Sequence, residues 1–367
     1  MKINMKIALV HDFLTQLGGA ERVLDELIEM YPEADVYTLV YDKEKTFGRY
    51  TKINLKTSFI QRLPGGVKHY KWYVALMPLA IRSFDLSKYN LIISDASAFA
   101  KGVRITNRAK HICYCHTPTR YLWQMEKEYV SAMTYPWIVK LMVRPVLYFL
   151  RIWDYRAAQR VDLFIANSKE VQGRIKKYYG RESQIIYPPI NTDFFRPANN
   201  PSRDYFLAVG RLEPYKKMDL VIRVFSDLGL ALKVAGTGSQ SLTLKSKILN
   251  PNIQFLGRVS DHELRALYQN AKAFIFPALE DAGMMILESL ACGTPVIAYG
   301  AGGALEFIRE GIDGEFFSEQ SESSLKTALK NFDQSKYESS NLSNQALRYS
   351  RQVFRDKLKL VAENFEN

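Results

Sequence analysis

The chain has 367 residues, of which 47% are hydrophobic and 24% charged, and its formal net charge is +12 at pH 7. This length predicts two domains, and the composition excludes a disordered or low-complexity protein. No signal peptide is predicted, because only Ile7–Val10 forms an apolar run near the N-terminus. Cys113, Cys115 and Cys292 lack metal-ligand spacing and are odd in number, so we expect reduced core thiols. Together these features predict a cytoplasmic protein.

The positive charge is concentrated in the first half. Residues 1–200 contain 30 Lys and Arg against 18 Asp and Glu, whereas residues 201–367 contain 20 of each. A segment with this excess of positive charge suits acidic partners, namely nucleic acid, anionic lipid or phosphorylated substrates. The alternative is a solubilising surface without a partner.

In chain order, short apolar runs alternate with amphipathic segments in both halves. The first predicted strand is 6–13, a helix is predicted over 20–31, and further strands follow at 34–41, 91–95, 111–116 and 162–168. Two prolines and the polar segment 191–204 predict a linker. The pattern then restarts, with predicted strands at 205–211, 230–236, 252–258, 273–279 and 294–300, and with a capping box at Ser260–Glu263. This alternation predicts two doubly wound parallel sheets with a cleft between them, in which ligands bind beyond the carboxyl ends of the strands.

Two loops that follow predicted strands carry glycines. Gly18 and Gly19 precede a helix, so the backbone can approach a bulky anion and the helix N–H groups can face it. A simple tight turn is an equal alternative. In VAGTGSQ, Gly236 and Gly238 follow a strand of the second half into its crevice.

A third loop, VGRLEPYKK, carries two cations. Arg211 ends a strand and Lys216 lies five residues on. An arginine and a lysine that converge on a strand-end loop suit a diphosphate, one by bidentate geometry and the other as a point charge. The alternative is a solvated pair of charges.

A fourth loop, EDAGMMILE at 280–288, holds two glutamates eight positions apart around Gly283. Glu280 is predicted in the loop, and Glu288 in the early turns of a helix that starts at Met284. A loop carboxylate can accept hydrogen bonds from sugar hydroxyls, and one near a helix start can accept from ribose hydroxyls while helix N–H groups face the phosphate. The two acids are therefore predicted to bracket one nucleotide sugar.

These segments resemble glycosyltransferase family four, retaining enzymes with the GT-B fold. The resemblance rests on GGAER, VGRLEPYKK, EDAGMMILESLACGTPVIA and GGALEFIREGIDGEFF, and it covers nearly the whole chain. It implies two Rossmann-like domains with the active site in the cleft between them. CHTPTRYLW, residues 115–123, further resembles a bacterial branch that includes mannosyltransferases of surface polysaccharide assembly.

The resemblance implies roles for the loops. Gly18 and Gly19 would approach the donor diphosphate, with Arg211 and Lys216 neutralising it. Glu280 would contact the transferred sugar and Glu288 the nucleoside ribose. His116 would hydrogen-bond the sugar near the reacting centre, although a lone histidine after an apolar strand is more often structural. The predicted donor-binding set is completed by Gly236, Gly283, Met284 and Met285.

One segment departs from the family pattern. The family usually has a bulky residue where this chain has Ala282, and related branches rarely have two methionines after the glycine. Ala282, Met284 and Met285 lie where backbone N–H groups should meet the donor sugar, so the identity of the sugar is less certain than the reaction type.

The implied mechanism is attack on the same face of the sugar, with the leaving diphosphate helping to take the acceptor proton. His116, Arg211, Lys216 and Glu280 would be the catalytic residues. The chain has no Asp-x-Asp motif, so we expect neither a metal nor another cofactor, and the nucleotide diphosphate sugar serves as co-substrate.

The acceptor is expected at the basic first domain. In the segment 135–160, a helix with 3.6 residues per turn would carry Lys140, Arg144 and Arg151 on one side. Interleaved aromatic residues suit anionic lipid, where lipid-linked acceptors reside, and a packing helix with a charged edge is an equal alternative. Residues 62–82 offer a second basic and aromatic patch.

The sequence thus predicts an acceptor-binding domain at 1–190, a donor-binding domain at 200–345 and a tail at 346–367 that crosses back. We expect a retaining hexosyltransferase at the cytoplasmic face of the membrane, with a nucleotide sugar and a glycan or lipid-linked acceptor as partners. GDP-mannose is slightly favoured over UDP-sugars. A catalytically weak nucleotide-sugar-binding protein is a second alternative. A nucleic-acid-binding protein is disfavoured because no recognisable motif for it occurs.

Overall fold

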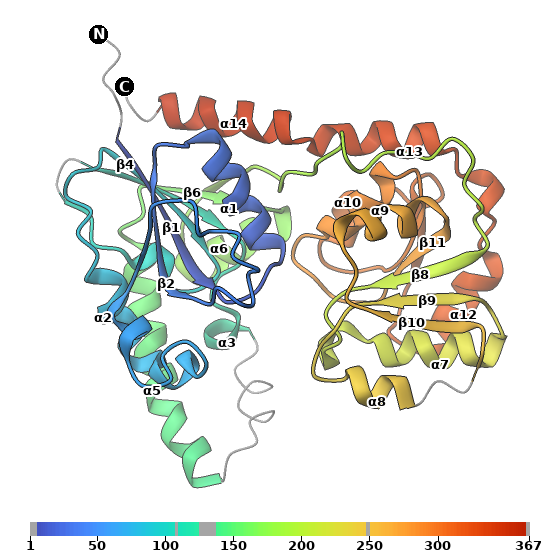
Figure 1. Ribbon diagram of the computed structural model, residues 1–367, viewed down its shortest axis with the longest axis horizontal. Coiled ribbons are helices and arrows are strands. Elements are labelled where there is room, and N and C mark those ends of the chain that lie inside the picture. Colours follow the sequence, from blue (N-terminus) through green and yellow to red (C-terminus); the bar gives the residue numbers. More distant parts are fainter. Residues whose placement is uncertain (1–5, 107–108, 125–136, 247–249, 365–367) are drawn as a thin grey trace. The chain divides into compact units, whose positions relative to one another are not determined.

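The computed structural model describes residues 6–106, 109–124, 137–246 and 250–364, with the side chains of 137–142 outside the description. The chain divides into two units, Met1–Tyr187 with Lys357–Asn367 and Pro188–Asp356. Each unit contains one parallel sheet with helices packed on it (Figure 1). The prediction of two doubly wound α/β domains is therefore confirmed. The domain boundaries near 190, 200 and 345 stay a sequence-based prediction.

The first sheet has seven parallel strands in the order β3-β2-β1-β4-β5-β6-β7. Its order reverses between β1 and β4, which are hydrogen-bonded neighbours. At such a reversal the following loops leave in opposite directions and open a crevice at the carboxyl edge. The strands are β1 (Ile7–Leu14), β2 (Asp35–Tyr41), β3 (Leu55–Thr57), β4 (Leu91–Ala96), β5 (Lys110–Cys115), β6 (Leu163–Ala166) and β7 (Ser183–Ile185).

The helices of the first unit have the amphipathic pattern and end signals that the sequence indicates. Helix α1 buries Val23, Leu24 and Leu27 at helical spacing. Helix α6 begins after Ser168, whose hydroxyl accepts from a backbone N–H, and ends at Gly180 with φ of 67°. The α-helices are α1 (Gly19–Met30), α2 (Met77–Arg82), α3 (Arg120–Trp123), α5 (Trp137–Ala158) and α6 (Lys169–Tyr179), and the 3-10 turns are η1 (Phe59–Arg62), η2 (Tyr70–Leu76) and η3 (Ala100–Gly102).

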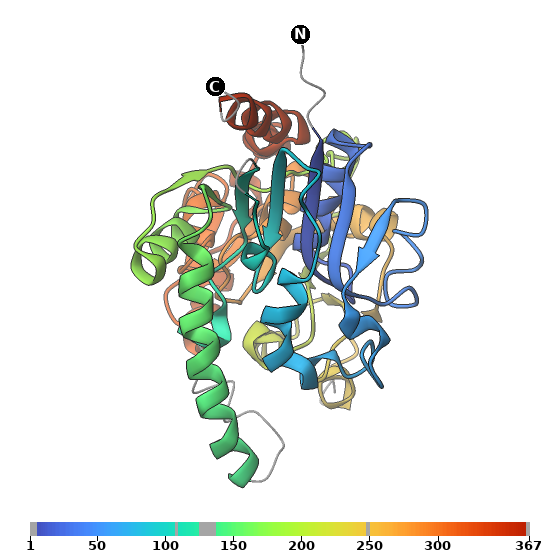
Figure 2. The ribbon, with the colours of Figure 1, turned by 90° about the vertical axis from the view of Figure 1, so that its left-hand side faces the viewer.

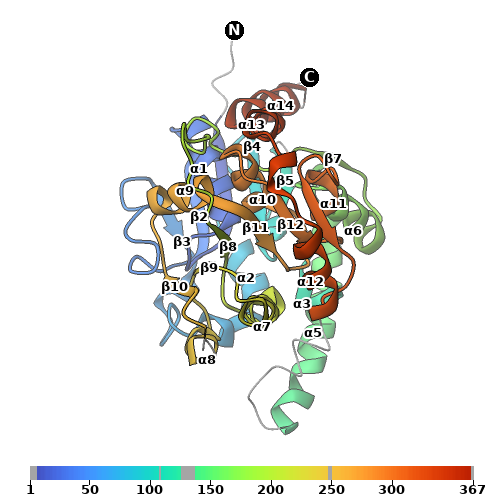
Figure 3. The same ribbon diagram turned by 90° about the vertical axis from the view of Figure 1, so that its right-hand side faces the viewer.

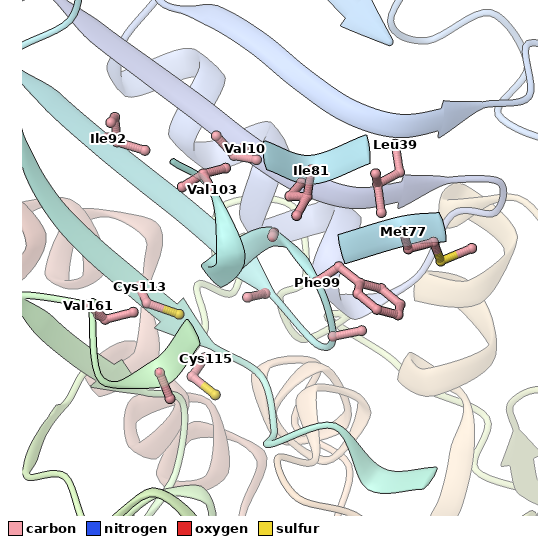
Figure 4. Close-up of a cluster of buried hydrophobic side chains, with 14 of the residues drawn as sticks. Val10, Leu39, Met77, Ile81, Ile92, Phe99, Val103, Cys113, Cys115 and Val161 are labelled. Carbon is pink, nitrogen blue, oxygen red and sulfur yellow. The ribbon is translucent and has the colours of Figure 1, made fainter. Parts of the chain in front are cut away.

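The core of the first unit lies between the sheet and α2, η3 and α5. Figure 4 shows Val10 and Ile92 of the central strands, Ile81 of α2 and Phe99 before η3 as members of one buried cluster. A side chain at Gly102 would collide with Trp153 of α5 and approach Ile81. Helices α2 and α5, the latter being the long green helix of Figure 2, therefore flank η3. The three cysteines are buried free thiols, as predicted.

The second sheet has six parallel strands in the order β10-β9-β8-β11-β12-β13, and its order reverses between β8 and β11. Helices α7 and α12 contact each other on one face, while α9 and α10 cover the other and α13 packs against α10 (Figures 1 and 3). The predicted capping box at Ser260–Glu263 is present at the start of α9.

The elements of this unit come from residues 205 onward. The strands are β8 (Tyr205–Val209), β9 (Leu232–Ala235), β10 (Ile253–Gly257), β11 (Ala271–Phe276), β12 (Val296–Tyr299) and β13 (Gly314–Phe317). The α-helices are α7 (Met218–Leu228), α8 (Ser241–Ser246), α9 (Asp261–Gln269), α10 (Met284–Ala291), α11 (Ala304–Phe307), α12 (Glu322–Asn331) and α13 (Ser339–Ala346), and the 3-10 turns are η4 (Pro214–Lys216), η5 (Gln334–Lys336) and η6 (Leu347–Tyr349). Helix α14 (Arg351–Asn364) begins in this unit, and from Lys357 onward it belongs to the first unit.

Candidate active site

The loops that follow β8 and β11 meet at the reversal of the second sheet, and they bring two predicted catalytic residues into contact. Lys216 ends η4 after β8, and Glu280 lies in the loop after β11. The Lys216 ammonium and the Glu280 carboxylate form an ion pair, with 10% and 18% of the two side chains exposed. This edge is where open α/β sheets bind ligands. The structure thus joins two residues that lie 64 positions apart in the sequence.

The turn that presents Lys216 is strained. The next residue, Lys217, adopts the left-handed conformation with φ of 54°, although it is not glycine. Such a residue costs on the order of 1–3 kcal/mol and is concentrated at functional sites. The strain allows a 3-10 turn to end at Lys216 while α7 begins at once with Met218.

Arg211 and Lys216 both lie against Tyr215. The Arg211 guanidinium donates to the Tyr215 hydroxyl at 2.7 Å, and the two cations lie 5.9 and 5.6 Å from the centre of its ring. Sequence reasoning missed Tyr215, although an aromatic residue between the two predicted cations was a usable signal. The ring faces both cations and restrains where they point.

The glycines after β8 and β9 are explained by close packing of two loops. A side chain at Gly236, where φ is 138°, would overlap the Gly210 carbonyl, and one at Gly238 would lie 2.5 Å from the Leu212 oxygen. The Leu212 N–H donates to the Thr237 carbonyl at 3.0 Å. Gly236 therefore has a structural role in setting the loop of Arg211, and its predicted contact with the donor stays a prediction.

The Glu280 loop is held in turn by the loop after β12. The Gly303 N–H donates to the Glu280 carbonyl at 2.8 Å. A side chain at Gly302, which has φ of 63°, would lie 2.6 Å from that same oxygen. Gly302 and Gly303 are site-forming residues that sequence reasoning did not single out, although adjacent glycines after a predicted strand were visible.

The remaining predicted donor-binding residues lie at the start of α10. Gly283 is its N-cap, where a side chain would meet Ile286 at 2.6 Å, and Met284 and Met285 are half-buried. Glu288 is buried with 1% exposure and lies 3.5 Å from the Tyr268 hydroxyl. Its predicted contact with a ribose stays a prediction.

In the first unit, the predicted glycine loop is tied to an acid of its own helix. Gly18 is the N-cap of α1, and its N–H donates to the Glu21 carboxylate at 2.8 Å. Glu21 itself is buried, with 3% exposure. Gly19 begins the helix. Sequence reasoning missed Glu21, although a glutamate three residues after an N-cap is a capping-box signal.

His116, which follows β5, belongs to a network of buried polar groups. Its Nε2 hydrogen-bonds one oxygen of Asp95 at 2.5 Å, and the other oxygen hydrogen-bonds His11 Nδ1 at 2.8 Å. His11 Nε2 lies 3.8 Å from Glu21 Oε1. Sequence reasoning missed His11 and Asp95, although each is a polar residue near the end of a predicted strand.

The charges of this network support one another. Burial alone would lower the pKa of His11, but the hydrogen bonds and charges of Asp95 and Glu21 raise it to about 10. Burial would raise the pKa of Asp95, but the two histidines hold it below its ordinary value. The ring of His11 is therefore charged at neutral pH.

The segment CHTPTRYLW contacts α5 through Asp154. This carboxylate accepts hydrogen bonds from Thr119 Oγ1 at 2.8 Å and from Trp123 Nε1 at 2.7 Å. It also forms an ion pair with the buried Lys101 at 2.5 Å. Thr119 and Trp123 therefore fix the segment to the core of the unit.

The predicted stripe on α5 is only partly a surface. The side chain of Lys140 lies outside the described residues, and Arg144 is exposed. Arg151 instead donates through Nε to the Leu122 carbonyl at 2.6 Å and lies over the Trp123 ring. Helical spacing groups the three cations but does not reveal that α3 packs against the last of them.

Within residues 6–106, 109–124, 137–246 and 250–364, no cluster of three or more His, Cys, Asp or Glu side chains could hold a metal ion. The expectation that the reaction needs no metal stays a prediction. Over the same residues, no helix is long and apolar enough to cross a membrane.

Comparison with known proteins covers both units. Residues 17–194 match the family model described as Glycosyltransferase Family 4, and residues 189–349 match Glycosyl transferases group 1. An uncharacterized glycosyltransferase of Methanocaldococcus jannaschii is 22% identical over 331 residues, 89% of this chain and 88% of that protein. D-inositol 3-phosphate glycosyltransferase of Mycobacterium tuberculosis is 26% identical over 191 residues, only 46% of this chain and 40% of that protein.

Solved structures share the fold. HepE (Alr3699) of Anabaena in complex with UDP-glucose superposes with a TM-score of 0.73 at 19% identity, covering 98% of this chain and 99% of that chain. Sucrose-phosphate synthase from Thermosynechococcus elongatus gives a TM-score of 0.77 at 14% identity, with the same coverage of both chains. With a family 4 domain followed by a group 1 domain, and with this fold in both units, the chain is a glycosyltransferase of the GT-B type.

Proposed function

We propose that the chain transfers a hexose, with retention of configuration, from a nucleotide diphosphate sugar to a glycan or lipid-linked acceptor of bacterial surface polysaccharide or glycolipid synthesis. The observation that carries the proposal is the contact between Lys216 and Glu280 at the reversal of the second sheet. It joins a cation suited to the leaving diphosphate with a carboxylate suited to the hydroxyls of the transferred sugar.

Each group then has a chemical task. The bond between the anomeric carbon and the diphosphate breaks, the acceptor hydroxyl attacks the same face, and its proton passes to the leaving phosphate oxygen. Lys216 and Arg211 stabilise the charge that develops on the diphosphate, while Glu280 accepts hydrogen bonds from the sugar. Losing one such charge contact costs on the order of 3 kcal/mol, roughly a hundredfold in rate. Because Glu280 already pairs with Lys216, the diphosphate competes with this carboxylate for the ammonium group.

The donor is GDP-mannose or a UDP-sugar. The slight preference for mannose rests on CHTPTRYLW, and two of its side chains, Thr119 and Trp123, are engaged by Asp154 in the core. HepE, a fold relative, was solved with UDP-glucose. We therefore propose GDP-mannose and UDP-sugars equally as donors.

Thermal-shift titration with GDP, UDP, ADP and their sugar conjugates separates the donors, because a ligand of the native state raises stability with concentration. A shift with GDP and GDP-mannose alone supports mannose transfer, and a shift with UDP compounds alone rejects it. If no nucleotide shifts the unfolding temperature, the proposed transfer from a nucleotide sugar is contradicted.

We further propose that residues 62–82 contact anionic membrane and so give access to a lipid-linked acceptor. This segment contains four basic residues and no acidic residue, all four being exposed. Trp72, Leu76 and Leu79 are exposed by 67%, 39% and 63%. Four lysines or arginines near an anionic bilayer contribute about 4 kcal/mol, and the apolar side chains can enter the interface.

Co-sedimentation with vesicles of neutral lipid, and with vesicles that also contain anionic lipid, tests this contact. We expect binding only with anionic lipid, and we expect Leu79→Ser to weaken it. Leu242, which is 85% exposed in the second unit, provides the matched control Leu242→Ser. Equal binding to both vesicle types, or equal loss in both variants, would contradict the membrane proposal.

The alternative function is that of a catalytically weak nucleotide-sugar-binding protein, and the residues at the start of α10 give a specific reason to test it. Ala282, Met284 and Met285 are half-buried at the start of α10 and give the donor pocket small or flexible walls. Under this alternative a nucleotide shifts the unfolding temperature, but no donor is turned over even with acceptor extracts present.

A further inference from the structure

Three buried polar side chains and one half-buried histidine form a line along the carboxyl edge of the first sheet. They are His116 after β5, Asp95 in β4, His11 in β1 and Glu21 in α1, and we call them the polar line. The ladder between β1 and β4 pairs His11 directly with Asp95. Glu21 ends the line by accepting the N–H of Gly18. The line therefore runs from the predicted sugar-binding histidine to the predicted diphosphate-binding loop.

The hydrogen-bond partners fix where the protons lie. A carboxylate can only accept, so His11 Nδ1 and His116 Nε2 must each carry a proton toward Asp95. The other nitrogen of His11 lies 3.8 Å from the Glu21 carboxylate, so an acid on either side favours the imidazolium form of His11. In His116 the proton on Nε2 leaves Nδ1 as the nitrogen that can meet a ligand.

Stability alone explains the polar line poorly. The side chains of His11, Asp95 and Glu21 are 3%, 0% and 4% exposed. Removing charges from water is costly, and apolar residues of similar volume are often as stabilising as a buried ion pair or more so. His116, at 12%, is the most exposed side chain of the line. The charged core of the line thus supports an imidazole that solvent or a ligand can reach.

We propose that Asp95 and His11 are positioning residues. Asp95 holds the His116 ring with Nε2–H inward and Nδ1 toward the transferred sugar, and His11 couples that carboxylate to Glu21 and through it to the Gly18 loop. The same charge network thereby positions both His116 and the Gly18 loop, the two groups that contact the donor in this proposal. This inference rests on the proposed function, which supplies the donor that those contacts meet.

The proton positions can be measured without any activity. In protein labelled with ¹⁵N-histidine, long-range ¹H–¹⁵N spectra distinguish the two neutral tautomers from the imidazolium, and single histidine variants assign the five histidines. At pH 8 we expect His11 doubly protonated and His116 protonated at Nε2. A neutral His11, or a His116 that carries its proton on Nδ1, would overturn the inference.

The variant Asp95→Asn removes the orienting charge and keeps the volume. We expect the His116 signals to move away from the pure Nε2–H tautomer. We also expect kcat for nucleotide release to fall on the order of a hundredfold with little change in the KM for the donor, because the ring is misplaced and not lost. The matched control is Ser94→Ala on the same strand, because Ser94 hydrogen-bonds His111 and not His116. This control should leave the His116 signals and kcat unchanged.

The two readouts separate two kinds of failure. If the wild-type protein turns over no donor but shows the expected proton positions, the proposed function fails and the polar line stands. If the protein is active and Asp95→Asn changes neither the tautomer nor kcat, the positioning role fails while the proposed function stands. A fall in kcat equal to that of Ser94→Ala would also reject the positioning role, because it would be a general effect of altering β4.

Discussion

Replacing Asp154 by alanine tests how much the first unit depends on one buried carboxylate. Asp154 is fully buried, and besides Lys101 it accepts from Thr119, Trp123 and the Tyr179 hydroxyl, the last at 2.7 Å. The Lys101 side chain is 1% exposed, so the variant leaves an ammonium group in the core without its acid. Removing one partner of a buried pair costs about 3–5 kcal/mol of unfolding free energy.

A second substitution tests whether the unpaired Lys101 charge causes the loss of stability. In the Asp154→Ala background, Lys101→Met removes the stranded charge, so the double variant should be more stable than Asp154→Ala alone. All four tryptophans lie in the first unit, so tryptophan fluorescence during urea unfolding reports on that unit. A loss below about 1 kcal/mol for Asp154→Ala, or further destabilisation by Lys101→Met, would refute the account of this ion pair.

Two further predictions concern stability. Gly236→Ala should lower the unfolding free energy of the second unit, because Gly236 has φ of 138° and a side chain there would overlap the Gly210 carbonyl. Gly173→Ala in α6 meets open space and should raise the unfolding free energy of the first unit by about 1 kcal/mol. Equal denaturation midpoints for the two variants would contradict both predictions. The pKa of His11 is raised from 6.5 to about 10, so its stabilising contribution is complete below pH 6.5 and is lost as the pH rises toward 10. Unfolding measured between pH 7 and 10 should therefore show a falling stability that His11→Gln flattens, and a parallel slope in that variant would reject the charged state of His11.

Much of the fold could be predicted because the strands are buried on both faces and appear as continuous apolar runs. The predicted strand at 111–116, for example, corresponds to β5 at Lys110–Cys115. The three-residue strands β3 and β7 were not separately predicted, because so short a segment carries no periodicity. The irregular turns over 59–76 also lack a helical or strand pattern.

The contact of Lys216 with Glu280 was within reach of the sequence, because loops after neighbouring parallel strands meet at one edge. The polar line was not, because it depends on which strands pair. His11 and Asp95 lie 84 positions apart, and only the β1–β4 register puts them side by side. Likewise, helical spacing groups Arg151 with Arg144 but cannot show that the Leu122 carbonyl takes the Arg151 guanidinium.

The most direct test of the central claim is nucleotide release from GDP-mannose and UDP-sugars by the wild-type protein, by Lys216→Met and by the neighbouring control Lys217→Met. Both variants remove one positive charge and keep a long side chain, but only Lys216 contacts Glu280 at the carboxyl edge of the sheet. The account predicts turnover of one donor class, a loss of roughly a hundredfold in Lys216→Met and little change in Lys217→Met. Turnover that survives in Lys216→Met, or falls equally in both variants, would contradict it.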